Sequence, residues 1–255
     1  MHQLERGAEV RDALTPYLDV DRSHPRHECW VIGHMVAGLD GTAAVGGRVG
    51  SLSTGPDAAL FPRMRQLADV VLVGAETVRR EGYGPVRLSE EARASRRRLE
   101  MSPTPPLAVV SRSLAFDWAA KVFADAPDDA RTLVITCASA DPQRLADAET
   151  VATVIVAGEE RVEPAAAMQA LADLGRRVVL CEGGPTWLGE LVAADRLDEL
   201  FLTVSPLMGG DQLPVAVTPP GAGLAEFDLL GIMAEDHTLF LRYERRLHPA
   251  SGSAS

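Results

Sequence analysis

The sequence predicts an α/β fold built on a single doubly wound sheet, mostly parallel, with an antiparallel strand at its C-terminal end. Three observations support this prediction. Short, continuous apolar runs, which suit strands buried on both faces of a parallel sheet, recur along the chain. Amphipathic helical segments and short links separate these runs. The last regular segment, residues 237–244, alternates imperfectly between apolar and polar side chains, as an edge or antiparallel strand does.

The apolar runs are the predicted parallel strands, and they are residues 30–36, 69–73, 107–110, 132–136, 151–156, 178–181 and 199–204. Between the first two runs, residues 57–68 place four apolar side chains on one helical face: Leu60, Phe61, Met64 and Leu67. Pro62 within this segment implies a kink or a late start. Three further helices are predicted by the same spacing, and they carry Leu145 and Ala148, Met168 and Leu171, and Leu188 and Leu191.

The composition is that of an ordinary globular protein. The chain has 255 residues, of which 46% are hydrophobic and 24% are charged. We predict three parts: an irregular N-terminal segment at residues 1–28, one domain at 29–247, and a disordered tail at 248–255. Nothing in the central part reads as a linker, so we expect it to be undivided.

Charge and cysteine content bear on partners and location. The net charge of −11 disfavours nucleic acid and anionic membrane surfaces as partners. No apolar run reaches the length of a membrane span, and no basic segment followed by an apolar one opens the chain. The 3 cysteines form no CxxC pair and no metal-binding spacing. This pattern predicts reduced thiols, no metal site and a cytoplasmic location.

The most informative turn follows the run at 178–181. Glu182, Gly183 and Gly184 come next, and a helix is expected from Pro185, because proline is favoured at the first helical position. The free N–H groups and the dipole of a helix start bind anions, so a pyrophosphate-bearing cofactor is the candidate ligand. A glycine pair can equally form a plain turn. The acidic Glu182 is not needed for a turn and favours the ligand-binding interpretation.

Other predicted strands end in similar turns. Gly74 opens a helical turn with Thr77, whose hydroxyl suits a phosphate, and Ser111 with Arg112 follows the third run. Arg112 can hold a ribose 2′-phosphate by a forked contact, or it can be a surface arginine at a strand end. Ligands of such sheets bind outside the carboxyl ends of the strands, so these turns should meet at one site. The glycine-rich residues 46–50 are expected to form a mobile loop over it.

The sequence lacks the dinucleotide fingerprint G-x-G-x-x-G, the P-loop motif and the G-x-S-x-G elbow. Five other motifs follow one another over about residues 30–245: Gly38-Leu39-Asp40-Gly41, Gly74-x-x-Thr77-Val78, Val110-Ser111-Arg112, Glu182-Gly183-Gly184-Pro185 and Pro206-Leu207-Met208-Gly209-Gly210. In this order they resemble the pyrimidine reductase of riboflavin biosynthesis, a family with the dihydrofolate-reductase fold. The family's zinc deaminase partner domain needs His-x-Glu and Pro-Cys-x-x-Cys. Neither occurs here, so the resemblance implies a stand-alone reductase.

The resemblance implies hydride transfer from NADPH to the ribosylamino carbon of a phosphorylated aminopyrimidine, which opens the ribose into a ribityl chain. It implies that the cofactor's phosphates are bordered by Gly74, Thr77, Gly183, Gly184, Pro185 and Thr186. Ser111 and Arg112 would bind the adenosine 2′-phosphate. The candidate catalytic residues are Asp40, Glu81 and Glu182, and the candidate substrate-binding residues are His34, Asp40 and Glu81.

Departures from the family pattern bear on the substrate. His34 stands where the family commonly has a substrate-binding lysine, and Glu81-Gly82-Tyr83 stands where it commonly has Asp-Asp-Pro. Gly38 replaces the family's usual serine. His34 can supply part of the missing charge, because imidazole changes charge near neutral pH. The alternative is a neutral histidine with a satisfied hydrogen bond.

Two other functions stay open. The same scaffold can reduce a dihydropterin, such as dihydrofolate, or another small heterocycle, with Glu81 or Asp40 bonded to the guanidine-like edge of the ring. The chain can also be a non-catalytic nucleotide-binding protein, against which the retained Asp40 and Glu182 argue. The resemblance implies a small-molecule substrate and a homodimer, with residues 200–204 and 239–243 near the interface.

Overall fold

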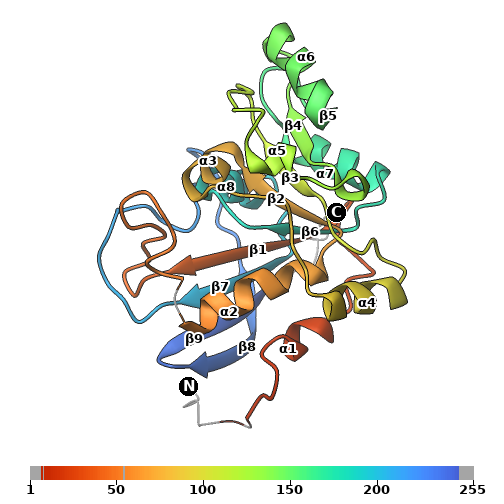
Figure 1. The fold of residues 1–255 in the computed structure, drawn as a ribbon. Coiled ribbons are helices and arrows are strands. Elements are labelled where there is room, and N and C mark those ends of the chain that lie inside the picture. Colours follow the sequence, from red (N-terminus) through yellow and green to blue (C-terminus); the bar gives the residue numbers. More distant parts are fainter. Residues whose placement is uncertain (1–6, 8, 54, 247–255) are drawn as a thin grey trace, which may run out of the picture.

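The structure is a computed structural model that describes residues 7, 9–53 and 55–246, and these contain one nine-stranded sheet (Figure 1). The strand order is β5-β4-β3-β2-β6-β1-β7-β9-β8. In this order, all neighbouring strands from β5 to β7 pair in parallel, whereas β9 pairs antiparallel with both β7 and β8. The strands are β1 Trp30–Ala37, β2 Val70–Gly74, β3 Leu107–Val110, β4 Leu133–Thr136, β5 Thr153–Val156, β6 Val178–Cys181, β7 Glu199–Val204, β8 Phe227–Glu235 and β9 Thr238–Arg245. The predicted single mixed sheet, mostly parallel, is confirmed.

The C-terminal end of the sheet has two antiparallel strands, where the sequence predicted one. The strand predicted at 237–244 is confirmed as β9, whereas β8 was not predicted. β8 lies at the edge of the sheet, and its register against β9 shifts between Leu229 and Gly231. This irregularity interrupts the alternation of buried and exposed side chains on which a strand prediction depends.

Helices cover both faces of the sheet. They are α1 Thr15–Leu18, α2 Gly55–Met64, α3 Ala75–Glu81, α4 Glu90–Arg98, α5 Lys121–Ala124, α6 Pro142–Val151, α7 Pro164–Asp173 and α8 Pro185–Ala193. Leu60 of α2 packs in one core cluster with Ile32 of β1. Met168 of α7 and Leu188 of α8 pack in another cluster with Val31, the neighbour of Ile32. Because successive strand residues point to opposite faces, the sheet is doubly wound, as predicted.

The N-terminal segment packs on this domain although it has little regular structure. Leu14, which directly precedes the short helix α1, and Tyr17, which lies within it, are buried in the core cluster that contains Leu60. Arg22 donates from Nε and Nη2 to the carboxylate of Glu199 on β7, at 2.8 and 3.2 Å. The boundaries predicted at 1–28 and 29–247 stay predictions. Residue 247 and the tail predicted at 248–255 lie outside the described residues.

Within the part of the chain that the structure describes, no helix is long and apolar enough to cross a bilayer. Among the same residues, no group of histidine, cysteine and carboxylate side chains is arranged to hold a metal ion. All three cysteines are buried free thiols. Burial raises the pKa of Cys29 and of Cys181 to about 12, so both stay protonated at neutral pH.

Candidate active site

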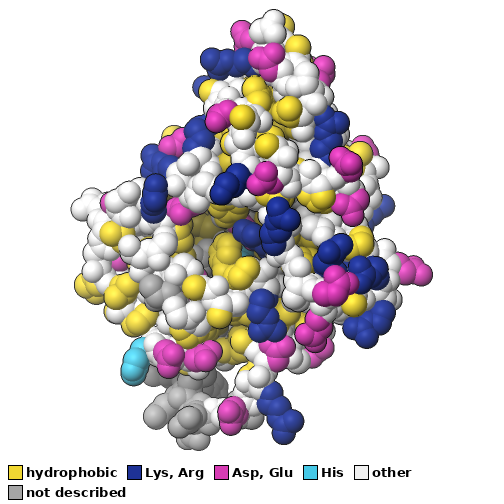
Figure 2. Space-filling model, in the orientation of Figure 1, with side chains coloured by type: hydrophobic (Ala, Val, Ile, Leu, Met, Phe, Trp, Pro, Cys, Tyr) yellow, Lys and Arg dark blue, Asp and Glu magenta, His cyan; other side chains and the backbone are white. Residues whose placement is uncertain are grey.

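The turns identified in the sequence meet at a cavity of about 930 Å³. The cavity opens beyond the carboxyl ends of β1, β2, β3 and β6, where ligands bind in sheets of this kind. Its lining includes His34, Gly74, Ser111 and Glu182, each within or directly after one of these strands. Figure 2 shows a hollow between α2 and α3, with hydrophobic side chains inside it and Lys or Arg side chains beside it.

Two glycine turns lie side by side in the cavity wall. The Gly74 N–H donates to the Gly183 carbonyl at 3.0 Å, and a Cβ on Gly184 would stand 2.9 Å from Thr77 Oγ1. Gly183 has a φ of +110°, which L side chains rarely adopt. The first turn of α8, from Pro185, also lines the cavity and adds the positive end of its dipole. This cradle, which a side chain would fill, fits a phosphate group.

The turn after β3 carries an arginine at the cavity rim. Arg112 is exposed, and among the described residues no hydrogen bond or ion pair engages its guanidinium. Ser111 Oγ accepts the Leu114 N–H at 3.0 Å, which leaves the hydroxyl proton free to donate. Arg79 and Arg80 of α3 also line the cavity, but both donate to the Glu76 carboxylate. Arg112 can therefore bind an anion without breaking an ion pair.

Glu182, directly after β6, has a fully buried carboxylate that accepts three hydrogen bonds. Arg65 Nε donates to Oε1 at 2.7 Å, and Arg65 Nη2 donates to Oε2 at 2.8 Å. The Tyr83 hydroxyl donates to Oε2 at 3.1 Å. Burial alone lowers the pKa of Arg65, but the charge and hydrogen bonds of Glu182 raise it overall. The two residues therefore form a stable ion pair at neutral pH.

His34 of β1 is buried in the same part of the cavity. Its ring stacks on Phe61 of α2 with the ring centroids 4.3 Å apart, and its Nδ1 has no hydrogen-bond partner among the described residues. Burial, assisted by the positive charge of Arg65, lowers the pKa of His34 to about 3. The expectation that His34 supplies positive charge is therefore wrong. The alternative of a neutral histidine is supported, but Nδ1 does not make the hydrogen bond expected of it with any residue that the structure describes.

The other candidate carboxylates hold loops. Glu81, at the end of α3, lines the cavity, and its Oε1 accepts the Val49 N–H at 2.8 Å. Asp40 is exposed and is not among the residues that line the cavity. Its carboxylate accepts the N–H groups of Gly209 and Thr42 at 2.9 and 3.2 Å, which lower its pKa. The turn that carries Asp40 therefore lies at the expected edge of the sheet, but the Asp40 carboxylate bonds to the backbone of nearby loops and does not line the cavity.

The glycine-rich loop predicted over the site is at the cavity, where Gly47, Val49 and Gly50 line the wall. The Asp211 carboxylate accepts the N–H groups of Gly46 and Gly47 at 3.0 and 2.5 Å. Together with the bond from Val49 to Glu81, these contacts attach the loop on two sides. The mobility expected of this loop stays a prediction.

Phe61, Arg65 and Tyr83 are among the cavity residues that the sequence-based candidates did not include. The helical pattern assigned Phe61 to the core. The structure divides the predicted helix at 57–68 into α2 and a short 3-10 helix, η1 (Arg65–Leu67). Arg65 follows Phe61 by four residues and so shares its apolar face, where a charge needs a buried partner. That spacing was the available signal for a buried ion pair.

Comparisons with known proteins agree with this geometry. The family described as RibD C-terminal domain matches residues 29–236. A 2,5-diamino-6-ribosylamino-4(3H)-pyrimidinone 5′-phosphate reductase of Archaeoglobus fulgidus is 30% identical over 187 residues, which cover 72% of this chain and 84% of that protein. The reductase of the same name from Methanothermobacter thermautotrophicus is 27% identical over 182 residues, which cover 71% and 79% of the two chains.

Solved structures give the same result. A pyrimidine reductase-like protein of Corynebacterium diphtheriae superposes with a TM-score of 0.79 at 26% identity, covering 93% of this chain and 96% of the other. The riboflavin biosynthesis reductase of Saccharomyces cerevisiae shares the fold, with a TM-score of 0.66 at 14% identity and coverage of 91% and 97%. This chain belongs to the RibD C-terminal domain family and is an oxidoreductase of the pyrimidine reductase type.

Proposed function

We propose that this chain uses NADPH to reduce a phosphorylated ribosylaminopyrimidine to its ribitylamino form. NADPH, when bound, supplies a hydride. The hydride adds to C1 of the ribosyl group, the ring C–O bond at that carbon breaks, and a proton goes to the released oxygen. The observation that carries the proposal is the meeting of two glycine turns, a free arginine and a buried ion pair at one cavity. Relatives named as reductases of this substrate class support it.

The cofactor would lie against the glycine turns. Gly183, Gly184 and Thr186 offer N–H groups, and Thr77 and Thr186 offer hydroxyls, where no side chain on Gly74, Gly183 or Gly184 blocks a phosphate. Ser111 and Arg112 would hold the 2′-phosphate, because the fork of a guanidinium matches phosphate geometry. All the cofactor-binding residues predicted from the sequence line this cavity, which supports their joint assignment.

Substrate binding would depend on Arg65. The guanidinium of Arg65 has five N–H groups. Two of them donate to Glu182, so three remain to donate to the substrate in the cavity. His34, being neutral, would exchange a hydrogen bond with the substrate and not a charge. Because three hydrogen bonds already occupy its carboxylate, we assign Glu182 to holding Arg65 and not to moving a proton. We assign Glu81 to the loop above the substrate, and Asp40 to the turn after β1.

One observation favours a second candidate, the reduction of a small heterocycle without a phosphate. Arg65 is already neutralised by Glu182, and His34 carries no charge. A dihydropterin would need no further cation beside Phe61, and its guanidine-like edge would suit a carboxylate such as Glu81.

The deciding experiment follows NADPH oxidation by absorbance with three substrates in parallel: the phosphorylated ribosylaminopyrimidine, its dephosphorylated form, and dihydrofolate. We expect kcat/KM for the phosphorylated pyrimidine to exceed the other two values by at least about tenfold. A preference for dihydrofolate would favour the second candidate. NADPH binding without turnover of any of the three would favour the non-catalytic alternative.

We also propose a homodimer through the sheet face opposite α2. Phe201 and Phe240 point into the core beneath α2, so their neighbours Leu202, Leu239 and Leu241 lie on the other face. Leu239 is 39% exposed there. Leu239→Glu should convert the dimer into a monomer in light scattering, whereas Leu99→Glu, at the exposed end of α4, should not. A monomeric wild-type protein would refute this assignment.

A cytoplasmic location and the absence of nucleic acid as a partner complete the proposal. The three buried cysteines are free thiols, as is usual for proteins of a reducing compartment. The net charge of −11 would repel nucleic acid. Fractionation of cells, followed by detection of the protein and its bound nucleic acid, tests both points.

A further inference from the structure

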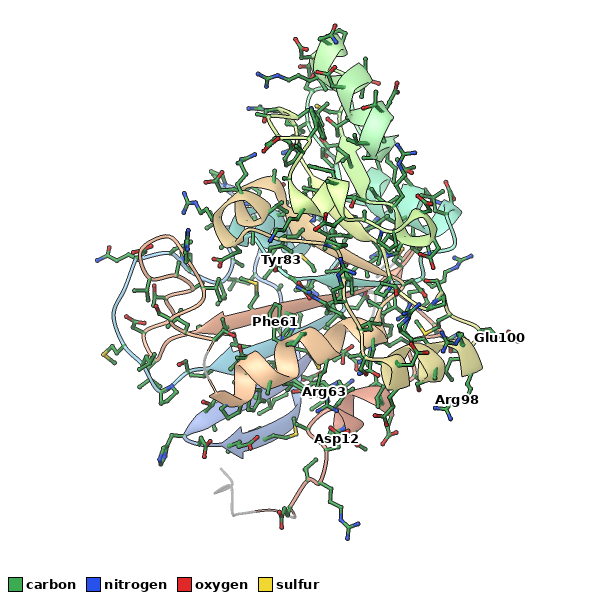
Figure 3. All side chains as sticks on the ribbon, in the orientation of Figure 1. Asp12, Phe61, Arg63, Tyr83, Arg98 and Glu100 are labelled. Carbon is green, nitrogen blue, oxygen red and sulfur yellow. The ribbon has the colours of Figure 1, made fainter. Side chains whose placement is uncertain are left out.

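The end of α3 turns Tyr83 into the cavity wall. Gly82 ends the helix with a φ of 64°, in the left-handed region that favours glycine, and the Tyr83 N–H donates to the Val78 carbonyl at 3.2 Å. In Figure 3, Tyr83 and Phe61 lie near each other between α3 and α2. The segment Glu81-Gly82-Tyr83, which departs from the family pattern, therefore contributes an aromatic side chain to the site.

Tyr83 contacts both members of the buried ion pair. Its hydroxyl donates to Glu182 Oε2 at 3.1 Å, and its ring centroid is 5.6 Å from the Arg65 guanidinium carbon. Phe61 contacts the same guanidinium at 5.9 Å. Burial, together with the negative charge of Glu182, raises the pKa of Tyr83, so the hydroxyl keeps the proton that it donates. Tyr83 thus restrains the carboxylate by a hydrogen bond and the guanidinium by its ring.

We propose that Tyr83 is a positioning residue for the substrate, and that it acts through Glu182 and Arg65. This inference rests on the proposed function, because it takes Arg65 as the group that contacts the substrate. Of the three N–H groups of Arg65 that Glu182 leaves free, one on each Nη nitrogen can converge on a single acceptor, and only if the guanidinium plane is held. The bidentate pair with Glu182 sets that plane, and Tyr83 holds Glu182 in place.

Tyr83→Phe keeps the ring and removes the hydroxyl. We expect it to raise KM for the pyrimidine substrate about three- to tenfold, the effect of one hydrogen bond. The value of kcat should change less than about twofold, because an interaction made equally in the ground and transition states affects KM alone. Tyr83→Leu, which also removes the ring contact, should raise KM further. The NADPH Kd should stay at its wild-type value in Tyr83→Phe, and Tm should fall by only a few degrees, as the loss of one buried hydrogen bond implies.

Tyr17→Phe is the matched control, because it removes a hydroxyl from a buried ring in the core beneath α2 and away from the cavity. It should leave KM unchanged. A double-mutant cycle with Arg65→Lys separates positioning from packing. If Tyr83 acts through Arg65, Tyr83→Phe should change KM less than about twofold in the Arg65→Lys background. Equal losses of substrate affinity in both backgrounds would overturn the inference.

A second measurement does not depend on turnover. In protein labelled with [15N]arginine, the Nε–H signal of Arg65 can be assigned by its loss in Arg65→Lys. Tyr83→Phe should accelerate solvent exchange of this proton severalfold, and an unchanged rate would overturn the inference. Lack of turnover of the pyrimidine by wild type would refute the proposed function alone, because the exchange measurement still tests Tyr83.

Discussion

Gly184 lies directly against Thr77, so that a Cβ on Gly184 would stand 2.9 Å from the threonine hydroxyl oxygen. Real Cβ atoms do not approach another heavy atom so closely. The two residues belong to different turns, one after β6 and the other after β2. Parallel pairing of β2 with β6 brings the turns together. The open space at this turn, where we propose that a cofactor phosphate binds, therefore depends on the absence of a side chain at position 184.

Gly184→Val is expected to weaken NADPH binding about tenfold to a hundredfold, because its side chain would occupy the phosphate position and displace Thr77. Fluorescence titration with NADPH measures the Kd, and Tm reports whether the fold survives. Gly223→Val is the control, since a Cβ at Gly223 meets no atom within 4 Å. An unchanged Kd in Gly184→Val would make the central turn structural only.

Arg112→Ala should weaken NADPH binding about tenfold to a hundredfold and leave NADH binding nearly unchanged. The reason is that a charge-assisted hydrogen bond to the 2′-phosphate, which only NADPH carries, is worth about 1.5–3 kcal/mol. Parallel titrations of both cofactors provide the test. Arg98→Ala, on the exposed end of α4, should affect neither cofactor. Equal losses for NADPH and NADH would remove Arg112 from the 2′-phosphate site.

The free energy of unfolding should fall as pH is lowered from about 6.5 towards 3, partly because of His34. The folded protein holds the pKa of His34 at about 3, against 6.5 for a free side chain. Between these values the unfolded chain binds a proton that the folded chain does not, so acid favours unfolding. In His34→Phe, which keeps a ring against Phe61, the slope of this free energy should decrease by up to about 1.4 kcal/mol per pH unit.

Urea titrations at several pH values between 4 and 7 measure that slope. His24→Gln serves as the control, because His24 is exposed in the folded protein and should leave the slope as it is in wild type. If the pH slope of the unfolding free energy were as steep in His34→Phe as in wild type, His34 would take up a proton in the folded state. It would then carry a positive charge in the cavity.

Arg22→Ala should lower the free energy of unfolding by about 1.5–3 kcal/mol, the range for hydrogen bonds to a charged group. Its guanidinium donates twice to Glu199, whose side chain is fully buried. Arg242 and Trp30 also donate to Glu199, so the carboxylate keeps partners after the substitution. Chemical denaturation measures the change, with exposed Arg11→Ala as control. A loss below about 0.5 kcal/mol would mean that the N-terminal segment adds little to the domain.

The strands of the sheet were predictable because burial on both faces leaves a direct trace in the sequence. β1 is buried at every position, and all of its residues except His34 are apolar. β8 left no such trace, because it lies at the edge and its register shifts near Gly231. The turns with Gly74, Ser111 and Gly183 were predictable as one site, because parallel strands must end at a common edge.

The side-chain contacts within that site were not predictable in the same way. Asp40 comes after a core strand, as the cavity residues Ser111 and Glu182 do, yet its carboxylate bonds to the backbone of Gly209. Arg65 lies 117 positions from Glu182 in the chain, and only the packing of η1 against β6 makes them partners. His34 looked able to carry charge until its burial beside Phe61 was known.

The sequence by itself determined the α/β class, the edge of the sheet that carries the cavity, and the positions of the glycine turns in its wall. These features follow from local periodicity and from backbone geometry, which each short segment carries within itself. Only the tertiary structure decided which carboxylates reach the cavity, that His34 is neutral, and that Arg65 and Tyr83 hold Glu182. Those properties depend on burial and on distances between segments far apart in the chain, which the packed fold alone establishes.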